Sequence, residues 1–182
     1  MGLLSIIRKQ KKKDQEVRVL VLGLDNAGKT TIVKKAQDED TEGVSPTMGF
    51  QIDTLVYHEY TLNMWDIGGQ TSLRGFWGNY FDQTDVVIWV VDGMSLERLR
   101  ESHDELMSKV VIQDRLKGIR LAVVVNKMDG VDTSQWEEVR DTVVSVLGLE
   151  QIDHELWHVF LVSGRTGLGL PSLLEWVIEG NT

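Results

Sequence analysis

The sequence predicts an α/β fold, in which a six-stranded, mostly parallel sheet with one antiparallel edge strand has helices on both faces. Strand-like apolar segments alternate with segments of helical spacing, and this alternation is typical of a parallel sheet covered by helices. Residues 86–91 form a continuous apolar run and residues 119–125 are apolar apart from Arg120, which indicates strands buried on both faces. Residues 50–57 and 60–65 are separated only by His58-Glu59, which indicates an antiparallel hairpin.

The remaining elements are predicted from apolar spacing and from loop-forming residues. Apolar residues that recur every three or four positions indicate helices, and Pro171 is tolerated in the first turn of the last one. In chain order we expect a strand over 17–22, a helix opening at 29–35, a loop over 38–47, an irregular glycine-rich segment over 68–84, helices over 96–116 and 134–147, a strand over 156–162 and a helix over 170–178.

Residues 23–30 read Gly-Leu-Asp-Asn-Ala-Gly-Lys-Thr and fill every position of the pattern G-x-x-x-x-G-K-[ST]. The octet lies between a predicted strand and a predicted helix, where glycines let backbone N–H groups turn inward and the helix dipole adds positive charge. The alternative is a glycine-rich turn without a ligand. We expect a nucleotide polyphosphate to be bound here by Gly23, Asp25, Asn26, Ala27, Gly28, Lys29, Thr30 and Thr31.

A second motif, Asp66-Ile-Gly-Gly-Gln70, follows the strand over 60–65. Asp66 is expected to hold Mg²⁺ through water, together with the hydroxyls of Thr30 and Thr47. The Gly69 N–H would approach the γ-phosphate, and Gln70 would orient an attacking water. Taken alone, the motif is typical of an ordinary turn, and Thr47 is typical of an ordinary loop residue. Only their order in the chain, after the phosphate-binding octet, favours the functional interpretation.

Asn126-Lys127-Met-Asp129 follows the strand over 119–125 and selects the base. A carboxylate at Asp129 accepts hydrogen bonds from guanine N1–H and its amino group, whereas adenine would leave it facing a lone pair. Lys127 can lie along the base plane, and Asn126 can connect neighbouring loops. After the last strand, Ser163 and the N–H of Gly164 are expected near guanine O6, although a plain turn is an equally good interpretation of these two residues.

Composition indicates one globular domain that does not bind nucleic acid as its main partner. The net charge is −9, but residues 1–18 carry six basic and two acidic side chains, so this segment has charge +4 and the rest −13. An acidic body argues against a nucleic-acid polymer as partner. The absence of cysteine excludes disulfides, thiolate zinc sites, palmitate and prenyl groups, and fits a cytoplasmic location.

Together these motifs resemble the Arf and Arf-like branch of Ras-type small GTPases over nearly the whole chain. The resemblance is carried by residues 23–30, Pro46-Thr-Met-Gly-Phe50, Trp65–Gln70 and Leu73-Arg-Gly-Phe-Trp77. It implies a single P-loop GTPase domain over 16–182 after an N-terminal extension over 1–15. It also implies a switch between GTP and GDP with Mg²⁺, in which Lys29 and Gln70 are catalytic.

The resemblance also implies partners. Residues 41–50 and 68–82 would be switch loops for effector, exchange and GTPase-activating proteins, and the hairpin between them would shift register with the nucleotide. Met1-Gly-Leu-Leu4, the octet and Asn79-Tyr-Phe81 look most like the Arf-like subtype two, which works with tubulin-folding cofactors. We therefore expect a monomer that acts in tubulin folding or microtubule organisation. A structural, nucleotide-bound subunit of a tubulin-cofactor complex and a membrane-traffic GTPase are the alternatives.

The amino end has apolar residues on one side of a short basic helix, including Leu3, Leu4 and Ile7. Such a helix can adsorb weakly to anionic membrane through residues 1–13, or can pack in a groove of the body or of a partner, which we favour. Ile6 stands where the myristoylation pattern requires Ser or Thr, so no myristate is expected on Gly2.

Hydrolysis is predicted to be slow without a helper protein. Gln70 is too weak a base to deprotonate water in advance, and Arg74 is not obviously placed as an arginine finger. Asp25 is expected near the γ-phosphate, where its side chain would crowd an incoming arginine. A P-loop kinase or ATPase conflicts with the motif at 126–129 and with the absence of an insertion that binds a phosphate acceptor.

Overall fold

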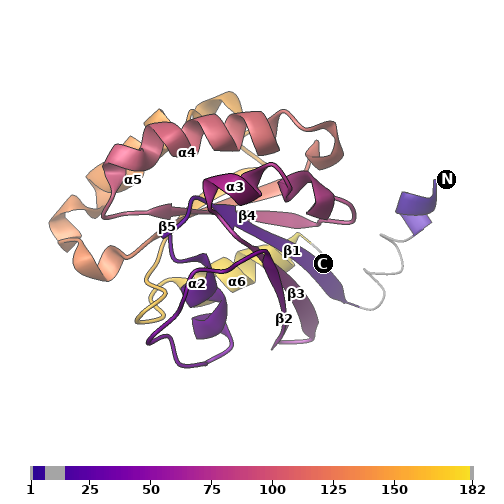
Figure 1. Cartoon of the computed structure of the whole chain (residues 1–182), viewed down its shortest axis with the longest axis horizontal. Coiled ribbons are helices and arrows are strands. Elements are labelled where there is room, and N and C mark those ends of the chain that lie inside the picture. The colour runs from indigo at the N-terminus through magenta and orange to yellow at the C-terminus, as the bar shows by residue number, and fades with distance from the viewer. Residues whose placement is uncertain (1, 7–14, 181–182) are drawn as a thin grey trace.

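The structure is a computed structural model that describes residues 2–6 and 15–180, and it has the expected three-layered α/β architecture (Figure 1). One six-stranded sheet has the order β2-β3-β1-β4-β5-β6, and every neighbouring pair is parallel except β2 with β3. The strands are β1 (Glu16–Gly23), β2 (Phe50–Tyr57), β3 (Tyr60–Ile67), β4 (Val86–Asp92), β5 (Arg120–Asn126) and β6 (Trp157–Leu161). The predicted fold class is confirmed.

Helices cover both faces of the sheet, α4 and α5 on one side and α2 and α6 on the other (Figure 1). Their bounds are α2 (Lys29–Ala36), α3 (Thr71–Arg74), α4 (Leu99–Leu106), α5 (Trp136–Val146) and α6 (Leu170–Glu179). Successive side chains of a strand point to opposite faces, so Leu20 and Leu22 join the core under α4 and α5, whereas Val19 and Val21 join the core over α2 and α6. The sheet therefore separates two hydrophobic cores.

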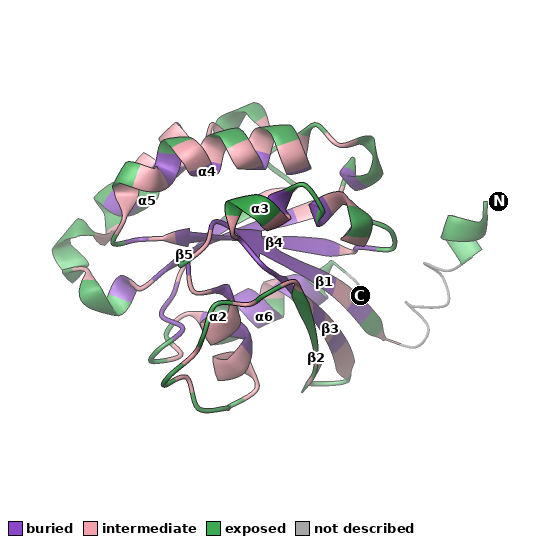
Figure 2. Ribbon diagram, in the orientation of Figure 1, coloured by how far each residue is buried: buried purple, intermediate pink, exposed green. Residues whose placement is uncertain are grey.

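Burial differs sharply between the central and edge strands (Figure 2). All residues of β4 from Val86 to Val91 are buried, as are the residues of β5 after Arg120. In contrast, β2 forms an edge of the sheet and leaves Phe50, Ile52 and Val56 exposed. The continuous apolar runs thus mark the centre of the sheet, and the hairpin lies at its margin.

The segment over 68–84 is more ordered than its glycine content predicts. It contains α3 and a 3₁₀ helix, Trp77–Tyr80, so the expectation of an irregular segment is wrong. Arg74 and Trp77 stand three positions apart and are both buried, and their side chains donate to the carbonyl oxygens of Gly69 and Gly68, respectively. These two side-chain hydrogen bonds to the backbone hold the segment against the end of β3.

The predicted helix over 96–116 is interrupted. It comprises a 3₁₀ turn (Leu96–Arg98), α4, a π-helical turn (Met107–Val111) and a second 3₁₀ turn (Asp114–Leu116). The wider π turn changes the angular step per residue, and Val110 is buried whereas Ile112 is 69% exposed. The segment over 134–147 is confirmed as α5, preceded by a 3₁₀ turn in which the Asp132 carboxylate accepts from the Ser134 N–H.

At the amino end, residues 3–6 are helical, and Leu3, Leu4 and Ile6 are exposed. The expectations for Ile7 and for the basic residues between 8 and 13 fall outside the described residues. Within residues 2–6 and 15–180, every helix is too short or too polar to cross a bilayer.

Candidate functional site

A cavity of about 450 Å³ lies at the carboxyl end of β1, between the phosphate-binding octet and the segments that precede β2 and follow β3. Its walls include most of the residues expected to hold phosphate and metal: Asp25, Asn26, Gly28, Lys29, Thr30, Thr31, Thr47, Gly69 and Gln70. The octet can curl around it because Gly28 adopts a φ of +96°, which favours glycine. The helix α2 then begins at Lys29 and adds its N–H groups to this wall.

Lys29 is the buried cation of the cavity. Its ammonium donates to the carbonyl oxygens of Gly23 at 3.1 Å and Leu24 at 2.7 Å, and only 6% of the residue is exposed. Burial lowers the pKa of Lys29 from 10.5 to about 8, and the carboxylates of Asp66 and Asp25 oppose this shift. A phosphate group in the cavity would stabilise the charged form and raise this pKa.

Three oxygen-bearing side chains meet beside Lys29. The Thr30 hydroxyl lies 2.5 Å from both the Thr47 hydroxyl and Oδ2 of Asp66. The other carboxylate oxygen of Asp66, Oδ1, is buried and lacks a hydrogen-bond partner among the described residues. Burial is also the main reason why the pKa of Asp66 lies above its ordinary value.

This donor set fits a small hard cation. Hydroxyl and carboxylate oxygens are ligands that Mg²⁺ accepts, and it commonly keeps several waters and binds substrate phosphates as well. The unpaired Oδ1 of Asp66 is an oxygen that metal-bound water would satisfy. Of the described residues, no three His, Asp or Glu side chains cluster to form a metal site of their own, so Thr30, Thr47 and Asp66 are the candidate metal ligands.

Gly69 and Gln70 line the same cavity as Lys29. A Cβ at Gly69 would lie 2.5 Å from the Gly23 carbonyl oxygen and would also collide with the Lys29 ammonium, so only glycine brings the backbone this close. Oε1 of Gln70 is buried, without a hydrogen-bond partner in the described part of the chain. An acceptor left unpaired at the wall of a polar cavity is suited to hold a water molecule.

The expected base-recognition residues also converge. Asn126 connects two loops, because its Nδ2 donates to the Ala27 carbonyl oxygen at 3.0 Å and its Oδ1 accepts from the Gly164 N–H at 2.8 Å. The Ser163 hydroxyl donates to Oδ1 of Asp129 at 2.9 Å. The Ser163 contact thereby holds Asp129, which follows β5, against the segment that follows β6.

The structure adds contacts in this region that the sequence does not predict. The Gly164 N–H already donates to Asn126, so a hydrogen bond to guanine O6 from this group would have to be shared. Lys127 has a left-handed backbone (φ +65°), and its ammonium donates to the Asn26 carbonyl oxygen and to Asp92, each at 2.8 Å. Asp92 was missed by the sequence reasoning, although its position at the carboxyl end of β4 is a signal that could have identified it.

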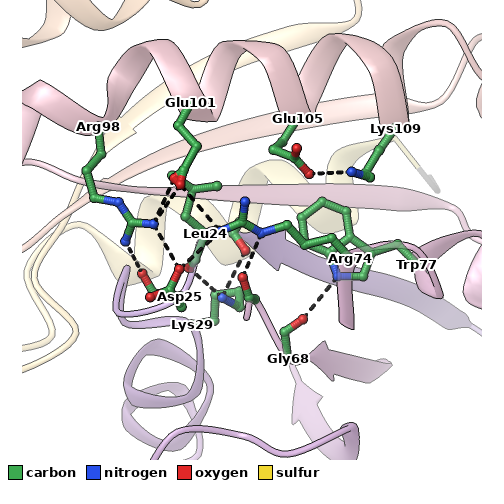
Figure 3. A network of polar contacts seen from close by, with 12 residues as sticks. Leu24, Asp25, Lys29, Gly68, Arg74, Trp77, Arg98, Glu101, Glu105 and Lys109 are labelled. Carbon is green, nitrogen blue, oxygen red and sulfur yellow. Dashed lines mark hydrogen bonds and ion pairs between the residues drawn. The ribbon is translucent and has the colours of Figure 1, made fainter. Parts of the chain in front are cut away.

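A second group that sequence reasoning missed surrounds Asp25 (Figure 3). Oδ1 of Asp25 accepts from Nη2 of Arg74 at 3.0 Å and from Nη2 of Arg98 at 2.9 Å. Arg98 also pairs with Glu101. Asp25 therefore lies at the cavity as expected, but its carboxylate is held by two arginines of this chain. Nothing in the sequence links Arg98 to Asp25, which lies 73 residues earlier.

Comparison with known proteins places these features in a family. The model of the ADP-ribosylation factor family (Arf) matches residues 3–181. ADP-ribosylation factor-like protein 2 is 47% identical over 180 residues in Arabidopsis thaliana, covering 98% of this chain and 95% of that protein. The protein of the same name from Drosophila melanogaster is 45% identical over 179 residues, covering 98% and 94%.

A solved structure is also similar. The Arl6 BBS3 small GTPase from Trypanosoma brucei, with the bound nucleotide analogue GppNp, superposes with a TM-score of 0.79 and 25% sequence identity. The superposition covers 91% of this chain and 97% of that one.

Proposed function

Because the chain belongs to the ADP-ribosylation factor family of small GTPases, we propose that it is a guanine-nucleotide switch that binds GTP or GDP with Mg²⁺ and hydrolyses GTP slowly. The observation that carries this proposal is a pair of buried acceptors that lack partners among the described residues: Oε1 of Gln70 on the cavity wall, and Oδ1 of Asp66, whose carboxylate also accepts from Thr30. The second oxygen of Asp66, Oδ2, accepts from the Thr30 and Thr47 hydroxyls, and Gln70 lines the same wall as Gly69.

The chain's own groups account for the chemistry of phosphoryl transfer. Lys29 and the N–H groups of the octet stabilise negative charge on the phosphates, and Gln70 orients water for in-line attack. Mg²⁺, when held by Thr30, Thr47 and Asp66, supplies further positive charge to the phosphate oxygens. Asp129 accepts hydrogen bonds from guanine N1–H and from its amino group, which gives selectivity against adenine.

Slow hydrolysis is expected because Arg74 and Arg98, the two arginines near the cavity, already donate to groups of this chain. Arg74 is only 4% exposed and donates to the Gly69 carbonyl oxygen and to Asp25. Arg98 donates to the carbonyl and carboxylate of the same aspartate. Neither guanidinium is free to stabilise the transition state, so an activating protein would have to supply that charge.

The switch would be read through segments 41–50 and 68–82. Met48, Phe50 and Phe76 expose apolar side chains there, with exposed fractions of 79, 48 and 58%. Resemblance to the Arf-like subtype two extends the proposal to tubulin-folding cofactors as partners, a monomeric state and a cytoplasmic, microtubule-associated location. Recovery of partners only by the GTP-bound form would support switching, whereas equal recovery by both forms would support the structural-subunit alternative.

The proposal is tested by the nucleotide that the chain binds. Full-length protein is stripped of nucleotide and titrated with GDP, GTP, ADP and ATP, each with Mg²⁺ and with excess EDTA. We expect guanine nucleotides alone to bind, and Mg²⁺ to tighten the binding. Preference for an adenine nucleotide, or no binding of any of the four, contradicts the proposal.

The catalytic assignment is tested by Gln70→Leu. Leucine keeps the approximate size of the side chain but removes the acceptor that orients water. We expect GTP affinity within about threefold of wild type, and single-turnover hydrolysis slower by at least about tenfold. Equal hydrolysis rates in the two proteins would show that Gln70 is not the residue that positions water.

A further inference from the structure

A partly exposed carboxylate lies on the wall of the proposed phosphate cavity. Asp25 lines the cavity together with Lys29, Gly69 and Gln70, and 41% of its side chain is exposed. A negative charge here is unfavourable for a polyphosphate ligand, because like charges repel at short range. The nucleoside triphosphate, which carries the additional γ-phosphate, is affected more than the diphosphate.

Two arginines from different elements neutralise this carboxylate (Figure 3). Arg74 belongs to α3, and Arg98 is the residue immediately before α4. Each places Nη2 within hydrogen-bond distance of Oδ1 of Asp25, at 3.0 and 2.9 Å. The hydrogen bond from Arg98 is the main reason why the pKa of Asp25 lies below its ordinary value.

Arg98 contributes a second contact that Arg74 lacks. Its Nη1 donates to the backbone carbonyl oxygen of Asp25 at 2.8 Å. The carbonyl and N–H of a trans peptide point in opposite directions, so this bond turns the N–H of Asn26 away from Arg98. Both carboxylate oxygens of Glu101 accept from Nη2 of Arg98, at 2.9 and 3.0 Å, and hold the guanidinium group of Arg98 in this orientation.

From this arrangement we propose that Arg98 sets the preference of the site for nucleoside triphosphate over diphosphate, by neutralising Asp25 on the cavity wall. The inference rests on the proposed function. Arg98 is a positioning residue, because it contacts Asp25 and does not itself line the phosphate cavity. Without it, only the charges of Arg74 and Lys29 remain to balance the carboxylate, and the γ-phosphate meets a less neutralised negative charge.

The test is an affinity ratio, the equilibrium affinity for the hydrolysis-resistant analogue GppNp divided by that for GDP, measured on full-length protein with Mg²⁺. We expect Arg98→Gln to weaken GppNp binding relative to GDP by about 3- to 10-fold, as for loss of one partly exposed charge interaction. Asp25→Asn in the Arg98→Gln background removes the unbalanced charge, so the ratio should return to within about twofold of wild type.

The matched control is Lys109→Gln, which breaks an ion pair of 2.7 Å with Glu105 further along the same helical segment (Figure 3). It removes one positive charge without touching the phosphate loop, and we expect an unchanged ratio. A fall in the ratio as large as that of Arg98→Gln would contradict the inference, because it would show a general effect of net charge.

Two further outcomes decide the matter. If wild type binds both nucleotides but Arg98→Gln keeps the wild-type ratio, the inference fails and the proposed function stands; if wild type binds neither, the proposed function fails. Should Arg98→Gln not fold, Asp25→Asn alone remains informative. A ratio equal to or above wild type supports repulsion by the carboxylate, and a fall as large as about threefold contradicts it.

Discussion

At the scale of single residues, the buried ammonium of Lys29 makes binding dependent on pH. Burial disfavours the charged form and lowers its pKa from the ordinary 10.5 to about 8. Bound phosphate stabilises the charged form, so nucleotide binding takes up a proton at any pH where Lys29 is partly deprotonated beforehand. Affinity is therefore expected to be constant below about pH 7 and to fall as pH rises above about 8.

Calorimetric titration with GDP in two buffers of different ionisation enthalpy measures this proton directly. At pH 8.5 we expect an uptake of more than about half a proton per site, and at pH 7 an uptake of about 0.1, because Lys29 has a pKa of about 8 before phosphate binds. Equal uptake at the two pH values would exclude Lys29 as the titrating group in contact with phosphate.

The proposed role of Asp129 predicts how a substitution there changes the choice of nucleotide base. Asp129→Asn replaces an acceptor by an amide that also donates, while the contact with Ser163 can persist. We expect GDP affinity to fall by at least about 100-fold, because guanine donors then face a donor, and xanthosine diphosphate, which has an oxygen in place of the amino group, to bind better. Competition titration with both nucleotides checks this, and unchanged selectivity would place the base elsewhere.

The residue scale also shows where sequence reasoning stopped. The octet, Asp66, Gln70 and residues 126–129 were identified because each follows a strand in a recognisable order. Arg98 was not, because one arginine among the 19 basic residues of the chain has no distinguishing neighbours in sequence. Its role depends on a contact across 73 positions, which only the folded chain creates.

At the scale of elements, β2 is the strand with the least support. Its backbone pairs only with β3, and Phe50, Ile52 and Val56 are exposed, whereas β4 and β5 are buried on both faces. Local opening requires little free energy where few apolar contacts are lost. We expect the amides of β2 to exchange with solvent at least about 100-fold faster than those of β4.

Hydrogen exchange monitored by mass spectrometry measures this difference, and the opposite edge provides the control. Strand β6 is also at an edge, but its Val159 and Phe160 are buried in the two cores. Its amides are therefore expected to exchange more slowly than those of β2. Equal protection of the two edge strands would contradict the view that side-chain burial sets the stability of β2.

Strands were predicted more accurately than helices, for a physical reason. Each strand was located to within two residues at either end, since apolar runs interrupted by turns leave little ambiguity. The segment over 96–116 was predicted as one helix, because apolar spacing cannot distinguish an α turn from a π turn. The short helices within 68–84 were missed, because they are held by side chains of Arg74 and Trp77 and not by local helix propensity.

At the scale of the whole molecule, ligand binding and folding are linked. The cavity is bounded by segments before β2, after β3 and after β1, and the buried Oε1 of Gln70 on its wall has no hydrogen-bond partner among the described residues. At a free nucleotide concentration of about 1,000 times Kd, binding adds about 4 kcal/mol to the free energy of unfolding. For a chain of this size we expect the melting temperature to rise by about 8–16 °C.

Thermal unfolding with GDP and Mg²⁺, compared with the stripped protein in EDTA, measures this rise. ATP at the same concentration serves as the control and should leave the melting temperature unchanged. An equal rise with ATP would show non-selective polyphosphate binding, and no rise with GDP would show that the cavity is not completed by nucleotide.

The bond between the Trp77 indole and the Gly68 carbonyl gives the molecule a built-in spectroscopic reporter. The indole N–H donates at 3.1 Å to a backbone group next to Gly69, while the ring itself is fully buried against Trp89. In an NMR spectrum of ¹⁵N-labelled protein, indole N–H signals are resolved from backbone amides. A change of the Gly68 peptide would therefore move the Trp77 signal, and rearrangement beside the γ-phosphate could be followed without attaching any dye.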